Sequence, residues 1–230
     1  MTQPIAVIGA MDEEIEVFKS HLELSREEQW HELTFYLGKL WGREIVLVKS
    51  GVGKVFAALV TQHLIDQYQP ASVIFTGVAG GLNPAYEIGD VVVAKDTVQH
   101  DVDVRVLGYQ RGQVPSSSYK EFVCDEQLVS KAMQTELEKG QLHLGRILSG
   151  DQFISDSQRP EFGYLREELG GDAVEMEGAA VGQVCVVNQI PFLVVRTISD
   201  QADGTATQDY KSFLPEVVQN SVAVVKQIVG

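Results

Sequence analysis

Two glutamates, Glu175 and Glu177, lie one residue apart in the stretch DAVEMEGAAVGQV, residues 172–184, which is otherwise largely apolar or small. An ionised carboxylate is costly to bury without hydrogen-bond donors, so a chain seldom places two in such a stretch for packing. In a buried site, carboxylates can take up protons or stabilise a developing positive charge. The alternative is that both side chains lie in solvent at a helix N-terminus, where the macrodipole favours acids.

Four further turns carry acids or glycines directly after β-branched runs. They are GAMDEE (9–14), TGVAGGL (76–82), SGDQFI (149–154) and RTISDQAD (196–203). In open parallel α/β sheets, ligands bind at the carboxyl ends of the strands. We therefore expect these turns to converge on one crevice, which Glu175 and Glu177 also enter.

Three of these turns also have a simpler interpretation. The glycines of TGVAGGL would let backbone groups approach a flat ligand closely, or they serve only as tight turns. Phe153 is either a core aromatic or a stacking face for a planar base. Ser199 and Asp200 could cap a following helix, but the next residues, QADGTA, do not have a helical pattern.

The common cofactor motifs are incomplete. The stretch SGVGK (50–54) is not a phosphate loop, because Val48 stands where that motif needs a glycine, and Phe56 stands where a dinucleotide fingerprint needs one. The five histidines show no pairing at i, i+4, which argues against zinc, and a hydrolase motif GxSxG is absent. The sequence predicts neither a metal nor a cofactor.

Short β-branched runs alternate with longer amphipathic segments along the chain, which is typical of strands covered by helices. The predicted strands are 4–10, 43–51, 72–80, 89–96, 143–150 and 192–200. The predicted helices are 13–22, 55–68, 126–137, 159–169, 177–188 and 211–229. Segment 32–49, with Gly42 between two β-rich runs, could form a hairpin near the sheet edge. We expect one α/β domain over residues 1–230, with a central mixed but mostly parallel twisted sheet flanked by helices.

The segment from His100 to Lys120 is long and irregular, yet it is rich in Val, Leu and Tyr. Such a composition is unusual for a free surface loop. The segment therefore either packs on its own domain or is covered by another subunit.

Composition limits the partners. The formal charge of −14 and the sequence pI near 4.7 oppose binding to nucleic acid or to an anionic membrane. No basic segment precedes an apolar run at the start, and eighteen apolar residues never stand together. Cys124 and Cys185 match no metal spacing and are expected to be reduced thiols. These features favour a cytoplasmic protein with a small neutral or cationic ligand.

Seven motifs occur in one order over nearly the whole chain: GAMDEE, SGVGK, TGVAGGL with GD downstream, HDVDV, SGDQFI, VEMEGAA and VVRTISD. In this combination the chain resembles the 5′-methylthioadenosine/S-adenosylhomocysteine nucleosidases of the purine nucleoside phosphorylase superfamily. The resemblance implies a nucleoside phosphorylase-like fold and hydrolysis of an adenine N-glycosidic bond without a cofactor. The products would be adenine and a 5-thioribose, in methionine salvage, with 5′-deoxyadenosine as a further candidate substrate.

The resemblance also implies roles for the acids. Asp200 would be the general acid at adenine N7, and Glu14 would activate the water. Glu177 would accept hydrogen bonds from the ribose hydroxyls. Four residues would assist them: Ser199 beside Asp200, Arg196 near the acids, Met176 against the sugar, and Glu175, which helps to hold sugar and water.

The remaining positions implied by the resemblance form the walls of the site. They are Val52, Val78, Ala79, Gly80, Phe153 and Ile154, with Tyr210 near the sugar. In family homodimers, the loop that corresponds to residues 100–115 reaches the 5′-thio pocket of the neighbour. Here Val104, Leu107 and Pro115 would form that wall.

Two positions depart from the family pattern and leave the 5′-substituent open between methylthio, homocysteinyl, deoxy and futalosine-type groups. Val78 stands where many relatives have Ser, and Leu107 takes a place that is often aromatic. A phosphorylase is disfavoured because Asp12, Glu13 and Glu14 would repel phosphate. A nucleosidase for a related substrate such as aminofutalosine stays open, as does a non-catalytic nucleoside-binding protein.

Overall fold

The structure of the protein is a computed structural model that describes residues 3–203 and 219–230. Its strands are β1 Ile5–Gly9, β2 Glu23–Trp30, β3 Leu33–Leu40, β4 Arg43–Lys49, β5 Ser72–Gly81, β6 Val91–Gln99, β7 Glu121–Val123, β8 Leu142–Ser149, β9 Ala173–Glu175 and β10 Phe192–Asp200. Its helices are α1 Asp12–His21, α2 Lys54–Tyr68, α3 Glu126–Ala132, α4 Tyr164–Glu167 and α5 Gly178–Asn188, with 3₁₀ turns at Arg105–Leu107 and Pro160–Phe162. Residues 219–229 are also helical.

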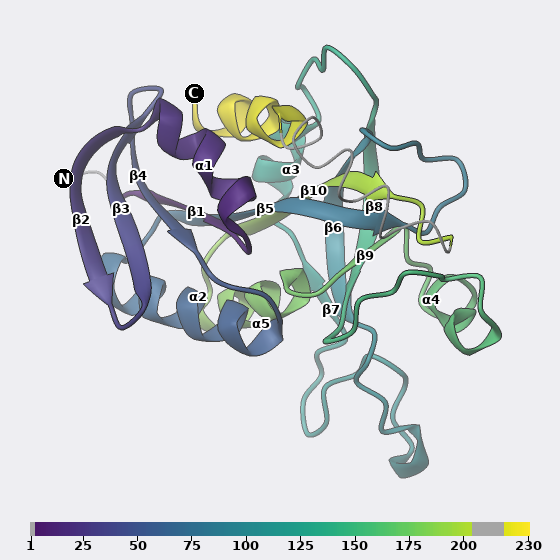
Figure 1. Ribbon diagram of the computed structural model, residues 1–230. Helices are drawn as coiled ribbons and strands as arrows, with labels where there is room; N and C mark the ends of the chain where they lie inside the picture. Colours follow the sequence, from purple (N-terminus) through teal and green to yellow (C-terminus); the bar gives the residue numbers. More distant parts are fainter. Residues whose placement is uncertain (1–2, 204–218) are drawn as a thin grey trace.

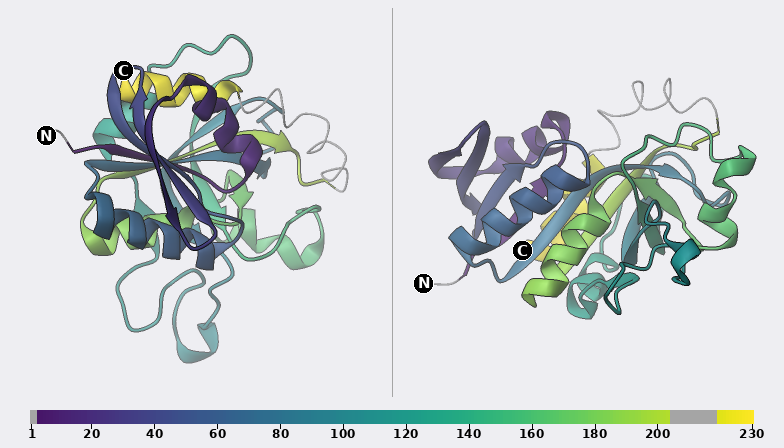
Figure 2. Two further views of the ribbon diagram at one scale, coloured as in Figure 1. Left: turned by 60° about the vertical axis from the view of Figure 1, so that its left-hand side comes forward. Right: turned by 90° about the horizontal axis from the view of Figure 1, so that it is seen from below.

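The strands form one sheet in the order β10-β6-β8-β9-β5-β1-β4-β3-β2, and β7 pairs with β6. An additional pairing of β10 with β5 closes the strands β5, β10, β6, β8 and β9 into a ring. Helices α2 and α5 lie side by side on one face of the sheet, and α1 and helix 219–229 lie on the other (Figures 1 and 2).

The α/β class and the mixed sheet agree with the prediction, but parallel pairs do not predominate. Among the described strands, five pairings are parallel and five are antiparallel. The predicted hairpin within 32–49 is confirmed as β3 and β4. Strand β2 was not predicted because its sequence, ELSREEQW, is charged and exposed along the sheet edge.

Two helices are shorter than their periodicity suggests. Helix α3 ends at Ala132, where Thr135 turns back to hydrogen-bond the Ala132 carbonyl. The predicted helix 159–169 is a 3₁₀ turn that begins at Pro160, followed by the single turn of α4 after Gly163. Of the predicted helix 211–229, residues 211–218 lie outside the described residues.

Strands β5 and β10 pair in parallel at the centre of the molecule, and every residue of both is buried. Two neighbouring strands that are buried on both faces hold their carboxyl ends rigidly. The acids and glycines that follow or end these strands therefore have fixed positions. Part of the segment 100–120 extends away from the sheet beyond β7 (Figure 1), whereas its residues Val114 and Tyr119 pack against the core of their own domain.

Candidate active site

A cavity of about 420 Å³ opens at the carboxyl ends of β1, β5 and β10. Three carboxylic acids that are far apart in the sequence, Glu14, Glu177 and Asp200, line it together. The full lining is Ala10, Met11, Glu14, Val52, Val78, Ala79, Gly80, Gln152, Phe153, Ile154, Val174, Glu175, Met176, Glu177, Ser199 and Asp200. The cavity thus combines an apolar wall with a small set of ionisable groups, as ligand sites usually do.

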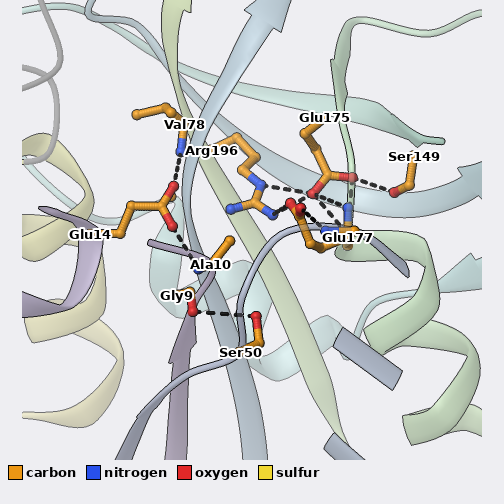
Figure 3. Close-up of polar contacts among 12 residues, drawn as sticks. Gly9, Ala10, Glu14, Ser50, Val78, Ser149, Glu175, Glu177 and Arg196 are labelled. Atoms are coloured by element: carbon orange, nitrogen blue, oxygen red, sulfur yellow. Dashed lines mark hydrogen bonds and ion pairs between the residues drawn. The ribbon is translucent and has the colours of Figure 1, made fainter. Parts of the chain in front are cut away.

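Glu14 lies in the first turn of α1 and is held by backbone amides from two strand ends. Its Oε2 accepts hydrogen bonds from Ala10 N at 2.6 Å and Met11 N at 3.0 Å, and its Oε1 accepts one from Val78 N at 3.1 Å (Figure 3). Burial raises the pKa of Glu14, although the Arg196 charge and these amides act in the opposite direction. A carboxylate has about four lone-pair directions, so about one remains for another donor.

Gly77 makes room for this arrangement. A Cβ atom built on Gly77 would collide with Oε1 of Glu14 and with Nη1 of Arg196. Because only glycine has no side chain, the motif TGVAGGL lets the two charged groups approach each other across β5.

Glu175, at the end of β9, is fully engaged with protein donors. It accepts hydrogen bonds from the Ser149 hydroxyl, from Gly178 N at 2.7 Å and from Arg196 Nε at 3.1 Å (Figure 3). Arg196 Nη2 adds an ion pair to the same carboxylate. Such two-point pairing of a buried guanidinium fixes both side chains. Glu175 therefore acts mainly on Arg196, with little capacity left for a ligand.

Glu177 accepts a hydrogen bond from Gly53 N at 2.7 Å, and its Oε2 lies 3.6 Å from Arg196 Nη2. Burial and the neighbouring charge of Glu175 raise the pKa of Glu177 to about 8, although Arg196 acts in the opposite direction. One guanidinium thus faces the carboxyls of Glu14, Glu175 and Glu177, and all four side chains are buried. This part of the cavity favours a ligand that develops positive charge.

Asp200 ends β10, lines the cavity and is buried. Its Oδ2 accepts a hydrogen bond from the Ser199 hydroxyl at 2.9 Å, and its Oδ1 accepts one from Ala202 N at 3.0 Å. The register of β10 against β5 shifts between Ile198 and Asp200, so that Asp200 stands opposite Gly80. A bulge of this kind re-aims side chains near ligand sites.

The N-terminus of α2 is occupied by carboxylates of the chain itself. The Gly53 amide donates to Glu177, and the Lys54 amide donates to Asp151 Oδ1 at 2.8 Å. The motif SGVGK therefore does not present these amides to a phosphate. Within residues 3–203 and 219–230, no group of three or more His, Cys, Asp or Glu side chains is arranged to hold a metal ion.

The similarity of the chain to known proteins agrees with this geometry. A family model described as the phosphorylase superfamily matches residues 4–230. A 5′-methylthioadenosine/S-adenosylhomocysteine nucleosidase from Marinomonas sp. (strain MWYL1) is 41% identical over 227 residues, which is 97% of each chain. The chain belongs to this nucleosidase family.

Solved structures extend the comparison. The 5′-methylthioadenosine/S-adenosylhomocysteine nucleosidase of Neisseria meningitidis, in complex with methylthio-immucillin-A, superposes with a TM-score of 0.93 at 37% identity and covers 99% of each chain. The futalosine hydrolase of Helicobacter pylori superposes with a TM-score of 0.91 at 36% identity and covers 99% of this chain and 97% of its own. The fold of the nucleosidase family is thus shared by enzymes named for different nucleosides.

Most positions that the family resemblance singled out lie around the cavity. Arg196 does not line it but lies behind it, among the acids. Tyr210 lies outside the described residues. Phe153 is 51% exposed, so the core interpretation of this aromatic is wrong. Leu107 is 70% exposed on a 3₁₀ turn, and it does not line the cavity of this nucleosidase chain, nor do Val104 and Pro115.

Four lining residues were not predicted: Ala10, Met11, Gln152 and Val174. Ala10 and Met11 belong to the turn GAMDEE and Gln152 to SGDQFI, both already recognised as motifs of the nucleosidase family. None of these three side chains carries a charge, so residue type alone did not indicate them. Val174 belongs to β9, which is only three residues long and has no clear alternating pattern.

Proposed function

We propose that residues 1–230 form one nucleosidase domain that hydrolyses the N-glycosidic bond of 5′-methylthioadenosine and S-adenosylhomocysteine. The products are adenine and the corresponding 5-thioribose, which returns to methionine salvage. The observation that carries the proposal is that Glu14, Glu177 and Asp200 together line one cavity of about 420 Å³. The sequence similarity to nucleosidases of this name over 97% of the chain supports the choice of substrate.

The carboxyls divide the chemistry between them. Asp200 protonates adenine N7 as the bond breaks, and the Ser199 hydroxyl at 2.9 Å orients its carboxyl. The sugar becomes cationic as the base leaves, and Glu177 accepts hydrogen bonds from its hydroxyls. Glu14, with three backbone donors already bound, uses its remaining lone pair to take a proton from the attacking water. No cofactor is needed for these steps.

In the proposed complex, the apolar wall of the cavity contacts the adenine base and the 5′-thio group. Phe153, half exposed at the cavity, stacks on the adenine ring, and Ile154 contacts its edge. Val78, Ala79 and Gly80 close the opposite side with backbone and small side chains.

The proposal includes a homodimer in the cytoplasm. Val55 and Phe56 on α2 are 76% and 50% exposed and follow Val52 of the cavity lining by three and four residues. Exposed apolar side chains near a binding site favour coverage by another subunit. The neighbouring subunit would supply Val104, Leu107 and Pro115 to the 5′-thio end. Two buried free thiols, Cys124 and Cys185, are consistent with a reducing compartment.

Adenine release tests the function directly. Purified protein is mixed with methylthioadenosine in phosphate-free buffer and in phosphate buffer, and adenine and ribose products are separated. We expect equal adenine release in both buffers and no ribose 1-phosphate derivative. Release that depends on phosphate would show a phosphorylase, and binding without release would show a non-catalytic nucleoside-binding protein.

The similarity to a futalosine hydrolase, with a TM-score of 0.91, favours one second candidate. An enzyme for a futalosine-type nucleoside would use the same carboxyls but accept a larger 5′-substituent. A panel of methylthioadenosine, S-adenosylhomocysteine, 5′-deoxyadenosine and aminofutalosine, compared by kcat/KM, separates the two. The proposed function predicts the highest value for a thio-nucleoside.

A further inference from the structure

Lys54, the last residue of SGVGK, joins three loops although it does not line the cavity. Its Nζ donates hydrogen bonds to Asp101 Oδ1 at 2.7 Å and to Gln99 Oε1 at 3.0 Å. Its backbone N–H donates to Asp151 Oδ1 at 2.8 Å. The side chain is 16% exposed, so it is not a freely solvated surface lysine.

Asp101 completes a closed ring of hydrogen bonds. Its Oδ2 accepts a hydrogen bond from Asp151 N at 3.0 Å, while its Oδ1 holds the Lys54 ammonium. Burial alone would raise the pKa of Asp101, but the hydrogen bonds from Lys54 and the Asp151 amide outweigh it and hold the pKa below its ordinary value. All three members of the ring thus bind one another, and each comes from a different loop.

Each of the three segments that carry Lys54, Asp101 and Asp151 also leads to an apolar residue of a cavity wall. Val52 precedes Lys54 by two residues and lines the cavity. Phe153 follows Asp151 by two residues and lines it as well. Asp101 begins the segment that, in the proposed dimer, leads to Leu107 at the neighbouring site. Between Val52 and Lys54, the Gly53 amide holds Glu177. A displacement of the ring would therefore move the apolar walls of the cavity and, through the Gly53 amide, the Glu177 carboxyl that binds the ribose hydroxyls in the proposed function.

We propose that Lys54 is a positioning residue that, through its ring with Asp101 and Asp151, sets the Val52 and Phe153 walls for the nucleoside. This inference rests on the proposed function for its substrate. It predicts a defect in binding more than in the chemical step, because Glu14 and Asp200 keep all of the hydrogen bonds described above when Lys54 loses its charge.

The test compares Lys54→Met with Lys54→Arg. Methionine keeps most of the side-chain length and is a good helix former at the start of α2. We expect Lys54→Met to raise KM for methylthioadenosine about tenfold, the scale of a lost hydrogen bond between charged groups, with kcat changed less than about threefold. Lys54→Arg restores the charge and should recover most of the affinity. Lys39→Met, in an exposed ion pair with Glu44, is the matched control and should leave both constants unchanged.

A second variant and a binding measurement make the result independent of folding and turnover. Asp101→Asn should reproduce the KM defect, and calorimetry with adenine should show weaker binding by Lys54→Met than by the wild type. An unchanged KM and adenine Kd in Lys54→Met, or an equal defect in Lys54→Arg, would overturn the positioning role. If the wild type binds adenine but releases none from methylthioadenosine, the proposed function fails, and the adenine Kd still tests the ring.

Discussion

The backbone amide of Val78 lies 3.1 Å from Oε1 of Glu14, so β5 holds a carboxyl in the first turn of α1. The two residues are 64 positions apart, and neither could form this contact without the pairing of β1 with β5. The contact leaves Glu14 with a fixed direction toward the cavity. Substitutions that keep the shape of the site but change its charge therefore separate chemistry from folding.

Glu14→Gln tests the activation of water. The amide cannot take up a proton, and its NH₂ group would face backbone donors that now bind carboxylate oxygens. We expect kcat for methylthioadenosine to fall more than about tenfold, which corresponds to about 1.4 kcal/mol in the barrier. Glu13→Gln on the exposed side of the same turn is the control and should retain full activity. A loss of less than about tenfold in the kcat of Glu14→Gln would contradict the role of Glu14 in activating water.

Asp200→Asn tests the general acid. The amide oxygen can still accept the hydrogen bond from Ala202 N, so the turn should keep its conformation. We expect turnover to fall by about 10²-fold or more, whereas calorimetry should show that the nucleoside still binds. Ser199→Ala should have a smaller effect, since it removes one donor from Asp200. Near-normal turnover of Asp200→Asn would exclude the acid assignment.

Glu177 predicts a dependence of stability on pH. Its pKa rises from 4.5 to about 8 on folding, first because of burial and then because of Glu175. Between about pH 4.5 and pH 8 the folded chain binds a proton that the unfolded chain releases, so the free energy of unfolding falls as pH rises. The loss of stability is absent below this pH window and complete above it. In urea titrations, the stability of Glu177→Gln relative to wild type should therefore increase from about pH 5 to about pH 8. A difference that is constant with pH would contradict the assignment.

Gly77→Ala tests the close approach of Glu14 and Arg196. The added methyl group collides with both side chains, and overpacking of this kind costs about 1–3 kcal/mol. We expect a lower midpoint in urea together with a loss of turnover, because Glu14 must move. Gly163→Ala serves as the control, since its Cβ would meet the Glu167 side chain only at ordinary contact distances. Equal behaviour of the two variants would show that the space at Gly77 is not needed.

Leu107→Asn tests the contribution of the neighbouring subunit. Leu107 is 70% exposed in the single chain, so the substitution should leave the free energy of unfolding of the monomer nearly unchanged. In the proposed dimer it raises KM for methylthioadenosine, with no loss of adenine binding. Val106→Asn is the control, because Val106 is 92% exposed and was not assigned to the wall. Sedimentation of the wild type as a monomer at assay concentration would remove the basis of this prediction.

Much of the site could be predicted because its chemistry depends on residue type. Glu14 and Asp200 are acids at the ends of predicted strands, and Glu177 is one of two acids in a stretch that is otherwise apolar or small, so these patterns are visible without coordinates, and the family resemblance implied their roles. The role of Glu175 was less accessible. The sequence places it beside Glu177, yet its partners Ser149 and Arg196 come from β8 and β10, and only the closed ring of strands brings them together.

The fold, like the site, could be predicted from the sequence only in part. Strands β5 and β10 are long and apolar, so their existence followed from composition alone. Their pairing in the ring did not, because hydrophobicity does not encode which buried strand lies beside which. Strands β7 and β9 have three residues each, and tertiary pairing rather than local preference holds them in place.

The carboxylates at the start of α2 have a consequence for the direction of the reaction. Since Glu177 and Asp151 occupy the Gly53 and Lys54 amides, an inorganic anion finds neither amide free, and in the proposed function solvent takes the place of the second substrate. Cleavage by water in a dilute aqueous medium is effectively one-way, whereas cleavage by phosphate is readily reversed. Such an enzyme consumes its nucleoside at any phosphate concentration. A rise in the concentration of free adenine does not convert the products back to nucleoside.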